Sequence, residues 1–233
     1  MEFIKRFWII LLAIMGLIST AGILSAKTIH NHYVKYRLVP EQSLQMASDN
    51  MAGLTSYRFH LESGFTVEQR EEVISKVDGE KADGNTHIKG EMVNTPVDIY
   101  YIDRTIYNYD SLAKRWLIIE SETNNSEELL VSELNPLSNF RLKALGEVEK
   151  IGFEKVDGAD CLVVRCQPAV ESQLLESMWK EFDYQFWIDY RQNLIRKATL
   201  TAKNQQNEQT SLKLTVHFDD FDKKIVIMPP VSG

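Results

Sequence analysis

The residues with the clearest chemical potential in this sequence are two cysteines, Cys161 and Cys166, in the stretch DCLVVRCQP. The apolar run between them predicts a single strand. Residues five apart on a strand point to opposite faces and sit roughly 16 Å apart. A disulfide needs Cα atoms within about 7 Å of each other. We therefore expect two unpaired, buried thiols, and the absence of a second ligand pair argues against zinc.

Two further groups could in principle bind a metal. His30 and His32 lie in KTIHNHYVKYRLV without a carboxylate or cysteine nearby, so a solvated segment is the simpler interpretation. Asp219, Asp220 and Asp222 could attract calcium, but the stretch lacks the glycine and the distal glutamate of a calcium loop. Asp also favours turns, and this stretch lies where two strands must turn. We expect no metal and no cofactor.

The sequence contains none of the common catalytic signatures. It has no glycine-rich phosphate loop, no His-Glu-x-x-His and no Gly-x-Ser-x-Gly. No carboxylate pair can be brought together from spacing alone. The net charge of -7, with no stripe of Lys and Arg, argues against nucleic-acid binding. We expect a protein that is not an enzyme and that has no catalytic residue.

The N-terminal segment predicts where the protein is located in the cell. Residues 7–26 contain no charge and follow Lys5 and Arg6. Twenty residues of helix span roughly 30 Å, the thickness of a bilayer's hydrocarbon core. Residues 1–26 are therefore a signal anchor or, with Ser19-Thr20-Ala21 as the cleavage site, a signal peptide. We favour a single-pass cell-membrane protein whose C-terminal domain is extracytoplasmic, and a secreted or periplasmic protein is the alternative.

Periodicity divides the rest of the chain. Residues 27–39 are expected to form a basic, aromatic juxtamembrane stalk. A helix is predicted over 40–54, where Leu44, Ala47, Met51 and Leu54 share one face. Further helices are predicted over 126–135, over the following segment up to 145, and over 169–182. Alternation of period two predicts strands over 56–63, 71–80, 86–93, 96–103, 105–110, 115–121, 147–156, 159–168, 182–189, 194–201, 210–221 and 223–230.

These elements predict an α+β fold. Short turns between neighbouring strands indicate an antiparallel sheet, and the alternation indicates one covered face and one wet face. The interspersed helices must cover the apolar face. We expect one large curved antiparallel sheet, an unclosed half-barrel, with helices packed on its concave face.

The order of elements resembles a known family. A membrane-targeting segment is followed by a helix, the strand YRFHL, a long sheet, a helix, the hairpin around YQFWID, and the closing stretch HFDDFDKKIVIMPP. This order resembles the lipoprotein-carrier superfamily, which is LolA- and LolB-like and includes LppX/LprG-type proteins. The resemblance covers roughly residues 40 to 230 and implies a LolA-like half-barrel domain over 40–233. It also implies an apolar cavity for acyl chains, with no catalytic residue to carry over.

Two functions follow from the resemblance. The first is a membrane-tethered protein that binds a lipid or acylated ligand in the cavity. The second is an interaction or sensor domain that has a filled core and binds another envelope protein, as in germination- or signalling-type relatives. An uncleaved anchor would make a diffusing shuttle doubtful. The candidate cavity residues on strands are Phe59, Leu61, Phe186, Ile188, Leu214 and Val216, and those on covering helices are Leu130, Leu134 and Trp179.

The uncharged N-terminal run generates the first prediction. The mature protein should keep its N-terminal segment uncleaved and remain in the membrane fraction after alkaline extraction, because residues 7–26 are expected to span the bilayer. N-terminal sequencing of the purified mature chain checks this. A mature terminus near Gly22 would establish the cleaved alternative.

Overall fold

The computed structural model describes residues 31–68, 70–120, 134–170 and 173–230. The chain divides into two compact units, residues 1–39 and 40–233. The expected membrane segment and residue Leu130 lie outside the described residues. Among those that are described, no helix is long and apolar enough to cross a membrane. In the first unit, residues 31–37 are helical and Tyr36 is exposed.

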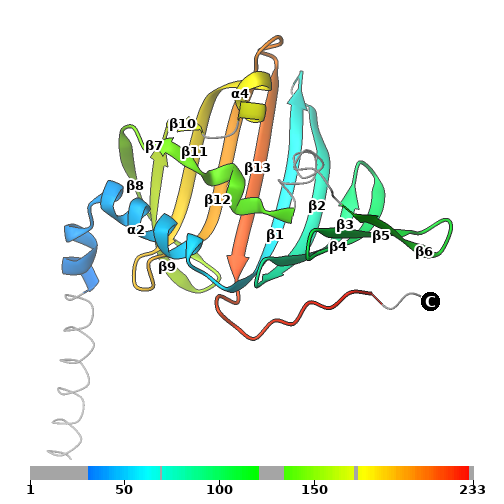
Figure 1. Ribbon diagram of the computed structural model, residues 1–233. Coiled ribbons are helices and arrows are strands. Elements are labelled where there is room, and N and C mark those ends of the chain that lie inside the picture. Colours follow the sequence, from blue (N-terminus) through cyan, green and yellow to red (C-terminus); the bar gives the residue numbers. More distant parts are fainter. Residues whose placement is uncertain (1–30, 69, 121–133, 171–172, 231–233) are drawn as a thin grey trace, which may run out of the picture. The chain divides into compact units, whose positions relative to one another are not determined.

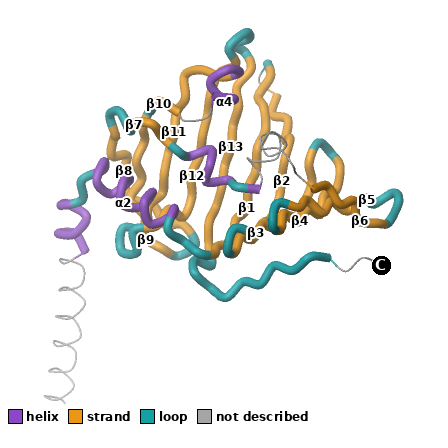
Figure 2. Tube along the Cα trace, in the orientation of Figure 1, coloured by secondary structure: helices purple, strands orange, loops and turns teal. Residues whose placement is uncertain are grey.

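The second unit is built on one sheet of eleven antiparallel strands (Figures 1 and 2). Their order is β6-β5-β4-β3-β2-β1-β13-β12-β11-β9-β8, so β6 and β8 are free edges and the sheet does not close. The strands are β1 (Ser56–Val67), β2 (Arg70–Ala82), β3 (Asn85–Met92), β4 (Thr95–Ile102), β5 (Thr105–Asp110), β6 (Arg115–Glu120), β8 (Val148–Val156), β9 (Ala159–Cys166), β11 (Trp179–Asp189), β12 (Leu194–Asn204) and β13 (Thr210–Asp219).

Two-residue turns explain why neighbouring strands are antiparallel. At four hairpins both central residues have positive φ, which matches the twist of paired strands. Asp and Asn tolerate this left-handed region better than most residues, and Gly adopts it without steric cost. The four turns are Asp83-Gly84, Val93-Asn94, Asp103-Arg104 and Asp157-Gly158.

The helix α2 (Pro40–Ala52) lies over one end of the covered, concave face (Figure 1). Pro40 suits the first helical position, and Glu41 in the first turn favours the positive end of the helix dipole. Leu44, Ala47 and Met51 are buried against β8, β11 and β12. The predicted helix and three residues of its apolar face are confirmed, but α2 ends two residues early, so Leu54 lies outside it.

The predicted helix over 169–182 is wrong at both ends and right only in its middle. Residues 169–170 form β10 (Ala169–Val170), α4 covers only Gln173–Met178, and β11 already begins at Trp179. The Trp179 ring stacks on Phe65 of β1 at 5.4 Å between centroids. A long-range aromatic contact and pairing with β12 therefore outweigh the helical spacing of the local sequence.

Two other segments differ from expectation. The segment after 135, which was expected to be helical up to 145, instead forms a 3-10 helix, η1 (Pro136–Phe140). It is followed by the strand β7 (Leu142–Ala144), which pairs with β10. Most of the helix predicted over 126–135 lies outside the described residues. The final segment, 223–230, is not a strand. Asp222 accepts hydrogen bonds from the backbone N–H and hydroxyl of Thr55, which ties the chain to the start of β1 as it leaves β13.

The cysteine assignment is confirmed. In the register of β9 with β11, Cys166 lies opposite Tyr184 and Cys161 lies opposite Asp189, so the two thiols are on different faces. Both are free and buried. Burial raises the pKa of each thiol to about 11. On the convex face Cys161 packs in a small apolar cluster with Val156, Val163 and Trp187.

The β11–β12 turn generates the second prediction. The buried carboxylate of Asp189 accepts hydrogen bonds from the N–H groups of Arg191 and Gln192 at 3.0 and 3.2 Å, and Oδ2 lies 3.5 Å from Arg196. Asp189→Ala leaves these donors without their partner, so we expect a loss of about 1–3 kcal/mol in the free energy of unfolding.

Asp110→Ala is the matched control. Asp110 accepts the same two backbone hydrogen bonds, from Leu112 and Ala113, but in an exposed turn. Water can replace the lost acceptor there, so the cost should stay below about 1 kcal/mol. Urea unfolding of both variants measures the difference. Equal losses would contradict the role assigned to burial of Asp189.

Candidate functional site: a pocket between α2 and η1

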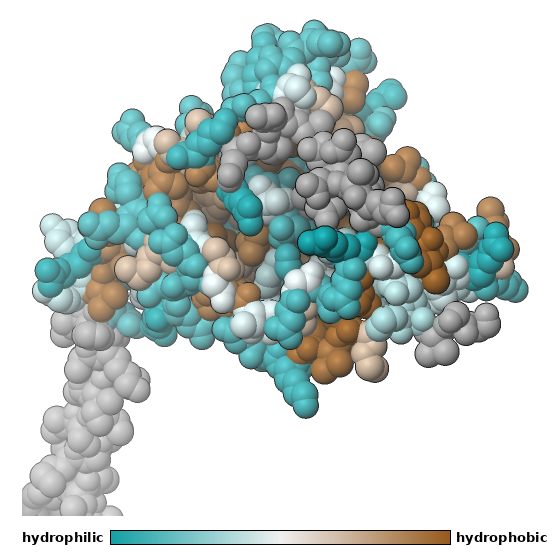
Figure 3. All heavy atoms as spheres, in the orientation of Figure 1, coloured by the Kyte–Doolittle hydropathy of each residue, from teal (hydrophilic) through white to brown (hydrophobic). Residues whose placement is uncertain are grey.

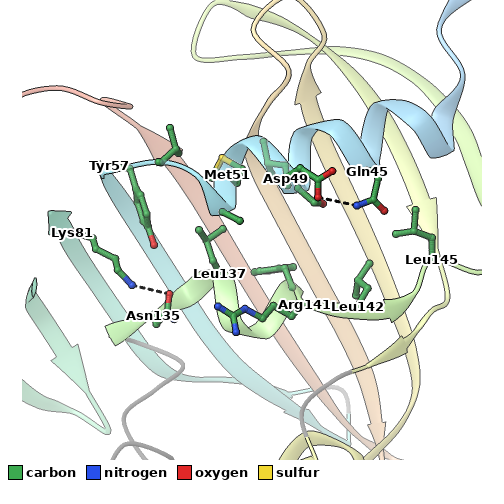
Figure 4. A pocket seen from close by; sticks show the side chains of 15 residues that line it. Gln45, Asp49, Met51, Tyr57, Lys81, Asn135, Leu137, Arg141, Leu142 and Leu145 are labelled. Carbon is green, nitrogen blue, oxygen red and sulfur yellow. Dashed lines mark hydrogen bonds between the residues drawn. The ribbon is translucent and has the colours of Figure 1, made fainter. Parts of the chain in front are cut away.

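A pocket of about 330 Å³ opens between α2, the η1–β7 segment and the covered face of the sheet (Figure 4). Its volume lies at the lower end of the range of small-molecule sites. In the space-filling view, apolar residues are visible inside the hollow of this face, with hydrophilic residues around them (Figure 3). We call this space the α2–η1 pocket. It is lined by Gln45, Ser48, Asp49, Met51, Ala52, Leu54, Tyr57, Lys81, Asn135, Leu137, Phe140, Arg141, Leu142, Leu145 and Ile195.

Phe140 anchors η1 to the sheet and so fixes one wall of the pocket. Its ring packs edge-on against Tyr184 and Phe186 at 5.9 and 5.8 Å between centroids. The Tyr184 hydroxyl donates a hydrogen bond to the carbonyl of Asn139 at 3.1 Å. Pro136 at the start of η1 has no N–H to satisfy. The wall is therefore held by buried contacts and not only by its short helical turn.

The apolar lining comes from three directions. Met51 lies in the last turn of α2 and Leu54 follows that helix. Leu137 comes from η1, and Leu142 and Leu145 follow it. Ile195 of β12 contributes from the sheet. Such a lining can take up a hydrocarbon chain, because burial of each methylene is worth roughly 0.8 kcal/mol.

Two cations give the pocket a polar end. The half-buried Lys81 of β2 donates to the Asn135 side-chain oxygen at 3.2 Å. Burial lowers the pKa of Lys81, and the charge of Arg141 lowers it further. Among the described residues, neither Lys81 nor Arg141 has a carboxylate partner.

The Tyr57 hydroxyl is a second polar feature of this end. Tyr57 is 2% exposed, and within the described part of the chain its oxygen has no hydrogen-bond partner. Its ring is held by Phe59 and Phe218, at centroid distances of 6.1 and 5.7 Å. Burial raises the pKa of Tyr57 far above its usual value, so the hydroxyl stays protonated. A buried donor without a partner costs free energy, and it is available to a ligand.

The structure brings most of the sequence-predicted cavity residues together on the covered face. Leu61, Val216 and Phe186 lie in one row across β1, β13 and β11, through Ala198 of β12. Leu214 lies in the neighbouring row on one side of this row, and Phe59 lies in a neighbouring row on the opposite side. Ile188 of β11 pairs with Ile195 of β12. All are buried, as are Leu134 and Trp179, although Trp179 is on a strand and not on a helix.

None of these eight residues lines the α2–η1 pocket; they lie in packed regions. Phe59 shows why: its ring lies so close to Gly79 that a Cβ there would collide with it. The pocket residues that sequence reasoning missed are mainly Tyr57, Lys81 and Arg141. Tyr57 starts the same alternation as Phe59 and Leu61, and pairs directly with Lys81 in the register of β1 and β2. The alternation that begins at Tyr57 was the available signal for its face, whereas the register that places it beside Lys81 comes from the structure.

Asp220 and Asp222, in the acidic turn after β13, bind neighbouring side chains and backbone of the protein. Asp220 contacts Arg58 at 2.6 Å and also Lys223, which lowers the pKa of Asp220. Asp222 binds Thr55. Over residues 31–68, 70–120, 134–170 and 173–230, no group of three or more His, Cys, Asp or Glu side chains could hold a metal.

Comparison with known proteins identifies solved structures that have a similar fold. No family model matches the sequence, and no curated protein is similar to it. Among solved structures, the lipoprotein LppX of Mycobacterium tuberculosis is similar with a TM-score of 0.55 and 16% identity, over 80% of this chain and 97% of that one. LprF of Mycobacterium bovis gives a TM-score of 0.54 and 15% identity, over 83% and 97%. The chain therefore has an LppX-like fold, built on an unclosed antiparallel sheet.

Proposed function

We propose that this chain is a non-enzymatic, membrane-tethered, extracytoplasmic protein that binds a lipid or an acylated hydrophobic ligand. The observation that carries the proposal is the α2–η1 pocket, an apolar-lined space of about 330 Å³ on the concave face of an unclosed sheet. Apolar pockets that contain a few convergent polar groups are the usual sites of ligand binding.

The fold and the N-terminal sequence support the same assignment. The fold is shared with LppX, which is a lipoprotein, and with LprF. The uncharged run 7–26 supports tethering at the membrane, with residues 40–233 outside the cytoplasm. A binding domain held at a bilayer surface is well placed to exchange a lipid with that bilayer.

Under this proposal the candidate residues of the covered face form a rigid apolar floor beneath the pocket's own lining. This floor consists of Phe59, Leu61, Trp179, Phe186, Ile188, Leu214 and Val216 on the strands, and Leu134 precedes η1 in the segment that covers it. The pocket-lining residues make the first contacts with the ligand. A floor that is already well packed keeps its shape when the pocket is empty.

A second function has an observation in its favour. The rows of the covered face are filled by their own side chains, as an interaction or sensor domain with a filled core requires. Such a domain would bind another envelope protein and would need no lipid. The two functions differ in whether the α2–η1 pocket holds a ligand in the purified protein.

Paired tryptophan substitutions distinguish the two functions. Leu137→Trp should fill the α2–η1 pocket and reduce co-purified lipid at least about tenfold, with little loss of stability because its side chain enters open space. Leu214→Trp overfills a packed row, so it should cost about 1–3 kcal/mol while the folded fraction keeps its lipid.

Native mass spectrometry and thermal unfolding of the full chain measure both effects. If the parent protein carries no lipid, and none after incubation with lipid vesicles, the carrier function is excluded and the interaction domain remains.

A further inference from the structure

The α2–η1 pocket has an unusual electrostatic environment for this protein. The whole chain carries a net charge of -7. Most arginines of the described sheet contact a carboxylate, as Arg58 does with Asp220 and Arg165 does with Asp183. Lys81 and Arg141 instead line one pocket, and the two positive charges repel each other there. The pocket therefore concentrates positive charge that no described side chain neutralises.

One carboxylate also lines the pocket and must be counted. Asp49 is exposed on α2, and it accepts a hydrogen bond from Gln45 at 2.9 Å. Two cations and one carboxylate leave a surplus of one positive charge in the lining. Figure 4 shows Asp49 on the α2 side, whereas Lys81 and Arg141 rise from the opposite wall.

Tyr57 supplies an independent observation at the same end. Its hydroxyl is buried, protonated and without a partner among the described residues, and it lines the pocket. Because Tyr57 and Lys81 are direct partners in the β1–β2 register, their side chains emerge on the same face of the sheet. A hydroxyl donor beside an ammonium and a guanidinium is the donor set that an oxyanion requires.

The cationic groups and the Tyr57 hydroxyl gather toward one end of the pocket, whereas the other end carries leucines together with Gln45 and Asp49 of α2. In Figure 4, Tyr57, Lys81 and Asn135 lie at one end, Arg141 lies between, and Leu142 and Leu145 lie toward the other end. A free anion would leave the apolar part unfilled, and a neutral hydrocarbon would leave the Tyr57 hydroxyl without a partner and the surplus positive charge unpaired. A molecule with an anionic head and an apolar chain satisfies both parts.

We propose that the α2–η1 pocket selects anionic amphiphiles, with the head oxyanion held by Lys81 and Arg141 and hydrogen-bonded by the Tyr57 hydroxyl. The inference rests on the proposed lipid-binding function and narrows it to a ligand class. The head is a phosphate or a carboxylate, which present the same oxygen acceptors. The hydrocarbon chain runs from this end along Leu137 toward Leu142 and Leu145.

The test compares amphiphiles that share one chain length. Decyl phosphate, decanoate and uncharged 1-decanol are added to the full chain in nanodiscs of zwitterionic lipid, and bound molecules per chain are counted by native mass spectrometry. We expect both anions to bind at least about tenfold more tightly than 1-decanol, and inorganic phosphate alone to bind far more weakly than decyl phosphate.

Substitutions then assign the selectivity to residues. Lys81→Met and Arg141→Met should each reduce the preference for decyl phosphate over 1-decanol to about threefold or less, without reducing 1-decanol binding. Tyr57→Phe should weaken anion binding severalfold while thermal stability is kept or raised, because a buried unpartnered hydroxyl is removed. Lys89→Met is the control and should change nothing, because Lys89 is an exposed lysine of β3 that pairs with Asp98 of β4.

Three outcomes would overturn the inference, and a fourth would overturn the proposed function as well. If 1-decanol binds as tightly as the anions and Leu137→Trp still abolishes that binding, lipid binding survives and headgroup selection does not. If inorganic phosphate binds as tightly as decyl phosphate, the pocket is an anion site without an acyl component. If Lys89→Met lowers anion binding as much as Lys81→Met, the preference reflects overall charge. If no amphiphile binds the parent, the proposed function itself fails.

Discussion

The antiparallel pairing of β1 with β13 is the contact on which the rest of the structure depends. It joins the strands from the first half of the domain to those from the second half, over the ten registered pairs from Arg58–Asp219 to Val67–Thr210. Loop-closure entropy opposes a contact between such distant segments, so local interactions must reinforce it. Asp222 does this where β13 ends, because it binds Thr55 just before β1 begins. Without the pairing of β1 with β13 there would be two smaller sheets and no common concave face.

The covering of that face explains the pocket. An antiparallel sheet with one apolar face must bury that face, and the chain supplies α2 and η1 for the purpose. Each is fixed to the sheet by its own contacts: α2 by Leu44, Ala47 and Met51, and η1 by Phe140. The two elements lie on either side of a gap, and the α2–η1 pocket occupies it. Among the described residues, Lys81 and Arg141 have no carboxylate partner in this gap and the Tyr57 hydroxyl has no hydrogen-bond partner, which makes these groups available to a ligand.

The sequence predicted the features that depend on local pattern. Period-two alternation located the strands, and Asp-Gly and Asp-Arg pairs located tight turns. The fold class followed from these, as did the placement of Cys161 and Cys166 on opposite faces. Trp179 was misplaced on a helix because its stacking on Phe65 is a contact across the sheet that no local spacing reveals.

The chemically active end of the pocket was missed for a related reason. Lys81 lay just beyond the strand predicted over 71–80, but the two-residue turn at Asp83-Gly84 lets β2 continue to Ala82, so Lys81 pairs with Tyr57. Arg141 gave no signal at all, because its position is set by the packing of Phe140 on Tyr184 and Phe186. Periodicity gives the face on which a side chain lies, whereas the filling of that face depends on contacts between distant segments.

The most direct test of this account is a crystal structure of the protein with a decyl phosphate that carries bromine at the end of its chain. The account predicts one bromine anomalous peak inside the α2–η1 pocket beside the leucines that follow η1, with the phosphate within hydrogen-bond distance of Tyr57, Lys81 and Arg141. A pocket without ligand, together with bromine bound only at exposed apolar residues such as Ile118 on the β6 edge, would contradict it.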